Sequence, residues 1–140
     1  MHTEGLFAPA TAEEARERFE AVGPTAQTTV REVAKAMDFD GEEYDRRVTP
    51  EVVATARETI FASLLEVYVG TREEYEEWAV DNPGYDVELI GSDQVDNVVW
   101  HPAPFADQLV AATFQDREAA AVGTLRRQAF GRIYREVVTE

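Results

Sequence analysis

Arg126 is the charged residue whose place in the sequence most needs a chemical explanation. It falls within the apolar arc of a predicted C-terminal helix, among Val122, Leu125, Ala129, Phe130, Ile133 and Val137. A guanidinium keeps its proton even when buried, so it needs a carboxylate, backbone carbonyls or an anionic ligand beside it. The sequence leaves two interpretations open. One is a structural role, as an internal ion pair or a side chain that extends to the rim; the other is an anion-binding site.

Arg57 poses the same question in a predicted central helix, where it lies within the apolar arc. Arg126 and Arg57 are therefore the candidate ligand-binding residues. The segment from Arg126 to Arg135 also holds four arginines and no acid. These arginines either complement the negative C-terminal end of the helix dipole or bind an acidic partner.

His101 is the only histidine outside the first ten residues and is the candidate catalytic residue. It follows Trp100 at the end of a predicted strand, a place where functional residues are frequent. As a general base it would need a carboxylate partner, and Asp107 and Asp116 are near it in the sequence. The alternative is a structural histidine held by hydrogen bonds. Because the chain has no cysteine and no second ordered histidine, the sequence predicts no metal site.

No other motif for catalysis or cofactor binding is complete. Asp38, Asp40 and Gly41 suggest a calcium loop. With Gly41 at the sixth position, however, Ala36 and Arg47 would stand where the loop needs Asp and Glu. The chain has no phosphate-binding glycine loop, no Gly-x-Ser-x-Gly elbow and no His-Glu-x-x-His pair. The sequence therefore predicts no cofactor and favours a protein that is not an enzyme.

Residues 25–47 have the outline of a helix-turn-helix, but their charge does not suit nucleic acid. The second short helix would carry Asp40, Glu42, Glu43 and Asp45 before its two arginines. A recognition helix presents Arg or Lys to phosphates, and the pI of about 4.4 is far from the basic value expected. We expect no direct binding to nucleic acid.

Acid excess is the dominant feature of the composition. The 140 residues include 28 acids and 13 bases, for a net charge of −15, and Lys35 is the only lysine. Such a charge destabilises the folded chain by self-repulsion in dilute buffer. Molar salt removes this cost, because the Debye length falls to about 3 Å at 1 M. The composition indicates adaptation to a salt-saturated cytosol; the alternative is an acidic protein of an ordinary cytosol.

The sequence also bears on location. No apolar run approaches the roughly 20 residues that span a bilayer. The first residues lack the basic start and the apolar block of a signal peptide. We therefore expect a cytoplasmic protein that does not contact the membrane.

Capping residues and hydrophobic periodicity predict the α+β class, with a helical N-terminal part, a three-stranded antiparallel sheet and a long C-terminal helix. Residues 1–10 are expected to form a loosely ordered arm, and residues 11–140 a single domain. Helices are predicted at 11–22, 24–37, 40–47, 49–70, 71–81 and 116–137, the one at 49–70 being the core. The expected capping residues are Thr11, Asp40, Thr49, Thr71 (in a capping box with Glu74) and Asp116. Strands are predicted at 85–89, 98–101 and 109–114, and their short connections favour an antiparallel meander.

Four stretches of the chain resemble an uncharacterised family of small haloarchaeal proteins. They read FASLLEV (61–67), GTREE (70–74), ATFQD (112–116) and TLRRQAFGR (124–132). The resemblance covers nearly the whole chain. It implies a salt-loving host and a single small domain of unknown function, and it brings no catalytic residues with it.

Two functions are consistent with these observations. The first is a non-catalytic protein-interaction domain of a halophilic cytosol, whose partner is a second copy or another protein. It rests on the missing catalytic constellation and on aromatic residues around the sheet, such as Tyr85, Trp100 and Phe105. The alternative is a small anion-binding domain or enzyme that uses Arg126 and His101, which predicts that both side chains share one pocket.

Overall fold

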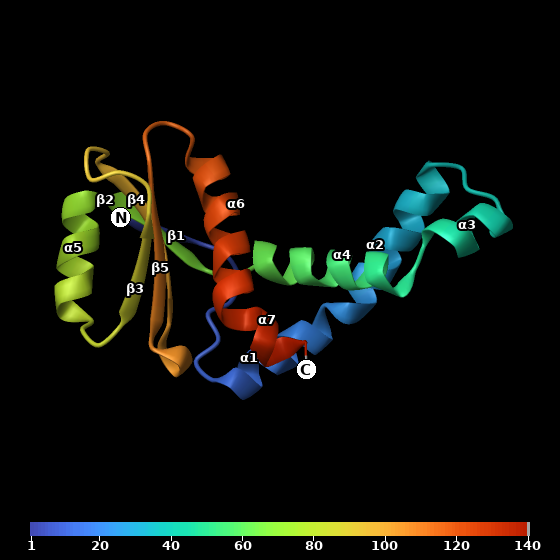
Figure 1. The fold of residues 1–140 in the computed structure, drawn as a ribbon, viewed down its shortest axis with the longest axis horizontal. Helices are drawn as coiled ribbons and strands as arrows, with labels where there is room; N and C mark the ends of the chain where they lie inside the picture. Colours follow the sequence, from blue (N-terminus) through green and yellow to red (C-terminus); the bar gives the residue numbers. More distant parts are fainter. Residues whose placement is uncertain (140) are drawn as a thin grey trace.

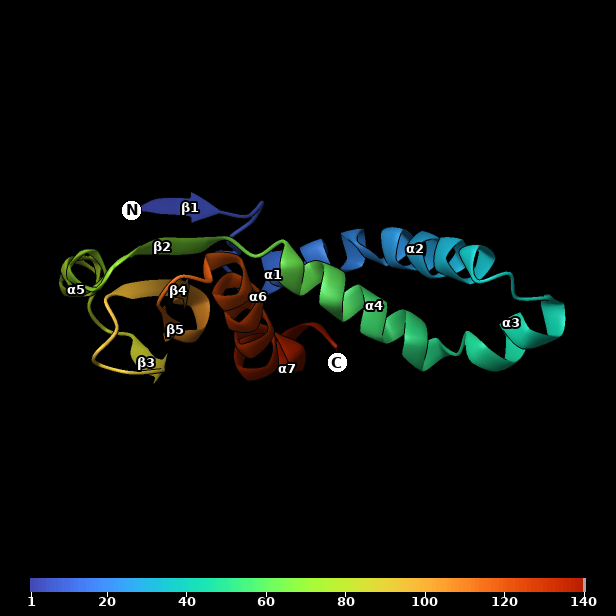
Figure 2. The same ribbon diagram turned by 90° about the horizontal axis from the view of Figure 1, so that it is seen from above.

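A five-stranded mixed sheet with helices on both faces forms one end of the molecule, and a helical arm forms the other (Figures 1 and 2). The computed structural model describes residues 1–139. The strands are β1 (His2–Glu4), β2 (Val67–Thr71), β3 (Asp86–Ile90), β4 (Asn97–Ala103) and β5 (Gln108–Phe114). The helices are α1 (Ala12–Ala21), α2 (Gly23–Ala36), α3 (Gly41–Arg47), α4 (Pro50–Ser63), α5 (Arg72–Asp81), α6 (Glu118–Ala129) and α7 (Arg135–Val138). The α+β class is confirmed.

The strand order in the sheet is β1-β2-β4-β5-β3. β4 pairs antiparallel with β2 and β5, β1 pairs antiparallel with β2, and β3 runs parallel to β5. The three predicted strands are present as β3, β4 and β5, but the three-stranded antiparallel sheet is wrong. Residues 91–96 carry the chain from β3 past β5. β3 and β4 lie two strand spacings apart, about 10 Å, and six residues can span about 20 Å. A short connection between two strands therefore does not require them to be neighbours in the sheet.

The predicted helix at 49–70 is wrong in its second half. Its start is confirmed, since the Thr49 hydroxyl accepts a hydrogen bond from the Val52 N–H at 3.3 Å, but α4 ends at Ser63. Val67 and Val69 then alternate as buried residues of β2. A short apolar run that is covered on both sides has the same sequence pattern in a helix and in a strand, so its periodicity does not distinguish the two. Pairing of β2 with β4 and β1 decides the outcome.

The first ten residues, expected as a loosely ordered arm, are joined to the sheet. His2–Glu4 pairs with β2 as an edge strand, and Phe7 and Pro9 are buried. Gly5 has φ 124°, and a Cβ there would lie 2.5 Å from the Leu65 carbonyl oxygen. Only glycine allows this approach, and it lets β1 cover the outer edge of β2.

Each face of the sheet has its own apolar cluster. α5 covers one face and α6 the other (Figure 1). The α5 face buries Tyr75, Val98, Trp100, Leu109 and Ala111. The indole Nε1 of Trp100 is buried without a hydrogen-bond partner among the described residues. The opposite face holds the larger cluster, which packs side chains of α1, α4 and α6 against the sheet, with Phe61 and Leu125 fully buried.

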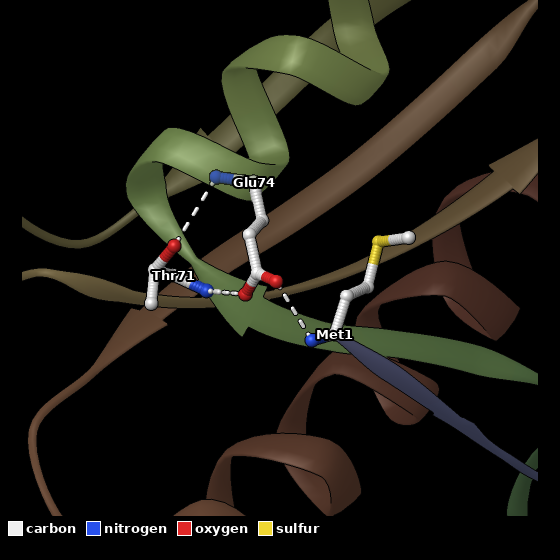
Figure 3. Close-up of polar contacts among 3 residues, drawn as sticks. All are labelled: Met1, Thr71 and Glu74. Carbon is white, nitrogen blue, oxygen red and sulfur yellow. Dashed lines mark hydrogen bonds and ion pairs between the residues drawn. The ribbon is translucent and has the colours of Figure 1, made fainter.

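Residues Thr71, Glu74 and Met1 tie α5 to the sheet (Figure 3). The Thr71 hydroxyl accepts from the Glu74 N–H at 3.2 Å, and the Glu74 carboxylate accepts from the Thr71 N–H at 2.9 Å, which confirms the predicted capping box. The Met1 ammonium donates to the same carboxylate at 2.8 Å. The ammonium and the Thr71 N–H together hold the pKa of Glu74 below its usual value.

The long C-terminal helix is confirmed, with one irregularity. The π-helical turn Phe130–Tyr134 joins α6 to α7. The expected cap by Asp116 is wrong, because α6 starts at Glu118 after Arg117 and no side chain caps it. Along residues 1–139, none of the helices combines the length and the apolar character that a bilayer crossing requires.

The arm consists of α2, α3 and α4, with α3 at its tip (Figure 2). α2 and α4 lie side by side, and α2 contributes only Ala26 and Ala34 as fully buried residues. Val33 and Met37 near the end of α2 are 53% and 60% exposed, and Val52 in the first turn of α4 is 43% exposed. The tip end of the arm therefore presents apolar side chains to solvent.

Candidate functional site

His101 lies on β4 and is 1% exposed. Its Nδ1 is 2.6 Å from the Glu66 carbonyl oxygen and its Nε2 is 2.7 Å from the Tyr134 hydroxyl. A carbonyl only accepts, so Nδ1 carries the proton and the Tyr134 hydroxyl donates to Nε2. Burial lowers the pKa of His101 to about 4, so the ring is neutral at neutral pH. Among the described residues, neither Asp107 nor Asp116 bonds to the ring.

Tyr134 is the partner that the sequence did not reveal. It lies in the π-helical turn, is fully buried, and packs its ring at 5.5 Å from the ring of Phe61. Burial raises the pKa of its phenol, which keeps the hydroxyl protonated as a donor. Tyr134 follows Phe130 by four residues, so its place on the apolar arc was the signal that could have identified it.

Arg126 binds backbone carbonyls and is partly exposed. Its Nε donates to the Leu65 carbonyl at 2.9 Å and its terminal nitrogen to the Glu4 carbonyl at 3.2 Å. No carboxylate of residues 1–139 forms an ion pair with it. Partial burial lowers its pKa. Of the structural roles considered for Arg126, bonding to backbone carbonyls with a side chain reaching the rim is the one that the geometry fits.

Arg126 and His101 come together at the junction between α4 and β2. Their acceptors are the carbonyls of two consecutive residues, Leu65 and Glu66. These carbonyls follow the end of α4 and would otherwise lie partly buried without a partner. Both ring nitrogens of His101 are used in this arrangement, which holds the junction against α6 and the π-helical turn. Neither residue lines the cavities described next.

Within the described part of the chain, Arg57 is the one of the three candidate residues that lines a cavity. Its Nε donates to the Phe19 carbonyl at 3.0 Å, and its guanidinium carbon lies 4.2 Å from the centre of the Phe19 ring. The same guanidinium lies beside Gly23, where a Cβ would be 3.5 Å from its carbon, an ordinary van der Waals contact. The two terminal nitrogens of Arg57 have no hydrogen-bond or ion-pair partner among residues 1–139.

We call the larger cavity beside this side chain the Arg57 groove. It has a volume of about 710 Å³ and runs from α3 and the first turn of α4, at the tip end of the arm, to α1 and residues 138–139 at its base. Its apolar walls are Phe19, Val48, Pro50, Val53, Ala54 and Val138, and its polar lining is Gln27, Tyr44, Thr49, Arg57, Glu58 and Thr139. Arg57 also lines a second cavity of about 560 Å³ beside the start of α2. An apolar groove with a fixed guanidinium suits an organic anion.

A second group of polar side chains was not foreseen from the sequence. The ring of His2 and the carboxylates of Glu4 and Glu118 lie with their ligand atoms within 4.8 Å of one another. His2 and Glu4 are exposed and Glu118 is partly exposed. β1 and the start of α6 bring them together. The prediction of no metal site stays a prediction.

The carboxylates as a group surround the apolar clusters without entering them. Every Asp and Glu among residues 1–139 is at least partly exposed, and His101 is the one fully buried charged or polar residue in that range. Most of these carboxylates have no cation within 4.0 Å in the described part of the chain. The acids therefore form a solvated outer layer.

Comparisons with known proteins give a family and no function. Neither the curated proteins nor the solved structures contain a match to this chain. The model of one protein family, described as a family of unknown function (DUF5809), matches residues 6–135. This match confirms the resemblance to an uncharacterised family over nearly the whole sequence. The chain belongs to the DUF5809 family of unknown function.

Proposed function

We propose that this chain is a non-catalytic protein-interaction domain of a salt-rich cytosol, and that its arm binds a second copy of the chain. The observation that carries the proposal is the exposure of Val33, Met37 and Val52 at the tip end of an arm that stands away from the sheet. Large apolar side chains grouped on a projecting element are typical of an interaction site.

The geometry of the arm suits self-association. α2 and α4 have 14 residues each and are therefore about 21 Å long. Two such helical pairs can bury their outer faces against each other as a four-helix bundle related by a twofold axis. Val33 and Met37 lie one turn apart at the end of α2, so they face the same side and would take part in that contact.

Light scattering after size-exclusion chromatography in about 2 M KCl tests the proposal, because this salt screens the repulsion between two chains of charge −15. The wild type is expected at twice 15.7 kDa. The double variant Val33→Glu/Met37→Glu should be monomeric. Val80→Glu is the matched control, since Val80 is 77% exposed on α5. A monomeric wild type, or a dimer that only Val80→Glu dissociates, would contradict the proposal.

The salt-rich cytosol is supported by the outer layer of unpaired carboxylates. Their mutual repulsion opposes the folded state at low ionic strength, and it vanishes when the Debye length is shorter than their spacing. Circular dichroism should show that helix content and thermal midpoint rise as KCl increases from dilute to molar. Full folding at low salt with no further gain would speak against this part of the proposal.

Anion binding is the second candidate function, and one observation favours it. Arg57 lines an apolar groove and its two terminal nitrogens have no partner among residues 1–139, so it offers what Arg126 and His101 were expected to provide. Arg126 and the Nδ1 of His101 donate to backbone carbonyls, and the Nε2 of His101 accepts from the Tyr134 hydroxyl. The ligand class that this groove suits is argued next.

A further inference from the structure

We propose that the Arg57 groove binds a small apolar monocarboxylate, whose carboxylate pairs with Arg57 and whose hydrocarbon part lies along the groove walls. This inference goes beyond the proposed interaction function and does not depend on it, because none of the exposed residues Val33, Met37 and Val52 lines the groove.

Arg57 is held in a fixed orientation before any ligand arrives. The Phe19 carbonyl holds its Nε, and the Phe19 ring stacks beneath its plane at 4.2 Å. Two contacts with one residue thus fix both the direction and the tilt of the guanidinium. Its terminal N–H groups form the flat fork that pairs with a carboxylate through two parallel hydrogen bonds. A fixed donor loses less entropy on binding than a mobile surface arginine.

The charge balance of the groove favours one negative charge. Among residues 1–139 the only acid that lines it is Glu58, and the Nε of Arg135 binds this carboxylate at 3.2 Å. Glu58 is therefore already compensated, and Arg57 is the charge left without a partner among residues 1–139. A single guanidinium matches a single carboxylate, whereas a polyanion would be repelled more strongly by a chain of net charge −15.

The walls define the rest of the ligand. Val48, Val53 and Val138 line the groove with hydrocarbon, and Tyr44 and Phe19 add aromatic surface. A hydrocarbon tail placed there leaves water, at about 25 cal/mol for each Å² of apolar surface that is buried. The volume of about 710 Å³ lies within the range of small-molecule sites. An inorganic anion would leave these walls in contact with water.

The test uses the full chain in about 2 M KCl and two probes of nearly equal shape, 4-phenylbutyrate and the neutral 4-phenylbutyramide. Isothermal titration calorimetry with probe up to about 5 mM covers the weak affinities expected of small ligands. The carboxylate should bind, and the amide should bind about tenfold more weakly or not at all, since hydrogen bonds between charged groups are the strong ones. Equal binding of the two probes, or no binding of the carboxylate, would overturn the proposal.

Two variants locate the binding. Arg57→Gln should weaken carboxylate binding about tenfold, to the level of the amide. Ala54→Phe should block the groove without touching the bonds of Arg57, so it decides the matter if Arg57→Gln fails to fold. Thr55→Phe adds the same ring to an exposed neighbouring position of α4 outside the groove, and its affinity should stay within about twofold of the wild type.

The outcomes of the variants are distinct. Loss of binding with Ala54→Phe but not with Thr55→Phe supports the groove as the site. Unchanged binding in Ala54→Phe, or equal losses in both phenylalanine variants, would overturn it. A shift of Tyr44 and Val53 resonances in nuclear magnetic resonance spectra on addition of the carboxylate gives a second readout. A wild type that is monomeric but binds the carboxylate probe would contradict only the arm proposal.

Discussion

The Nε2 atom of His101 lies 2.7 Å from the hydroxyl oxygen of Tyr134, so β4 and the π-helical turn of the C-terminal helix are joined by one buried hydrogen bond. Thirty-three positions separate the two residues in the sequence. The π-helical turn is the local irregularity at which this contact is made. Together with the hydrogen bond from His101 to the Glu66 carbonyl, this bond connects β4, the π-helical turn and the junction between α4 and β2 through one neutral imidazole ring.

Removing the Tyr134 hydroxyl should destabilise the fold. Tyr134→Phe keeps the ring in place but leaves the buried His101 nitrogen without its donor, at a cost of about 1–3 kcal/mol. The free energy of unfolding in urea, measured in molar KCl, checks this loss. Tyr44→Phe is the control, because Tyr44 is only partly buried and its hydroxyl has no hydrogen bond among the described residues. Equal stability of Tyr134→Phe and wild type would contradict the assigned bond.

Stability should fall as the pH drops below the ordinary pKa of histidine. The pKa of His101 is about 4 in the folded chain and about 6.5 when unfolded. Between these two pH values the unfolded chain binds more protons than the folded chain. The contribution of His101 to the free energy of unfolding is therefore complete above pH 6.5 and is lost towards pH 4. Its size is about 3 kcal/mol, an order-of-magnitude figure from the difference of the two pKa values.

The measurement compares wild type with His101→Gln over pH 5.0–7.5, in urea and molar KCl. The difference in unfolding free energy between the two should shrink as the pH falls, since glutamine does not titrate. Nuclear magnetic resonance should show the His101 ring neutral down to about pH 5. A ring that becomes charged near pH 6.5 would show that His101 is not desolvated as the structure has it.

Arg126 should matter for stability through hydrogen bonds to the backbone. Arg126→Ala removes the donors to the Leu65 and Glu4 carbonyls and should cost about 1–2 kcal/mol. Arg127→Ala is the neighbouring control, since Arg127 is exposed and reaches only the Thr124 hydroxyl, at 3.5 Å. Arg127→Ala should change the unfolding free energy by less than about 0.5 kcal/mol. Similar losses in both variants would point to a general charge effect instead.

Docking of β1 should depend on Gly5. A methyl group at this position would meet the backbone at residues 65 and 66, and the positive φ of 124° disfavours any side chain. Gly5→Ala should therefore cost about 1–3 kcal/mol. It should also speed amide hydrogen exchange in β2, whose edge β1 covers. Gly41→Ala serves as the control, because a Cβ there has nothing within 4 Å. Slow exchange in β2 of Gly5→Ala would contradict the close approach.

Local chemistry predicted the helix starts well. Four capping side chains each accept a hydrogen bond from the backbone N–H of the residue three positions later, as their sequence contexts indicate: those of Thr11, Asp40, Thr49 and Thr71. The same reasoning failed at Asp116, where no cap forms. A capping side chain bonds to a backbone N–H only three residues away, so the local sequence is enough to predict the bond.

Partners remote in the sequence were beyond the reach of such reasoning. The wheel identified Arg126 as a charge within an apolar arc but could not name its acceptors, which lie 61 and 122 positions away. It placed Arg57 after Arg126, and it could not show the groove beside Arg57, which forms only where side chains of α1, α2, α3, α4 and α7 meet. A helix wheel shows which side of a helix is apolar, and it does not show which element covers that side.

By itself the sequence determined the α+β class, four of the helix starts, three of the strands and a surface layer of carboxylates, because each depends on neighbouring residues or on composition. Tertiary structure alone decided that residues 67–71 pair as β2, that β1 closes the edge of the sheet and that β3 lies beside β5. The physical reason is that strand pairing and the satisfaction of buried polar groups are set by segments that meet only when the chain folds.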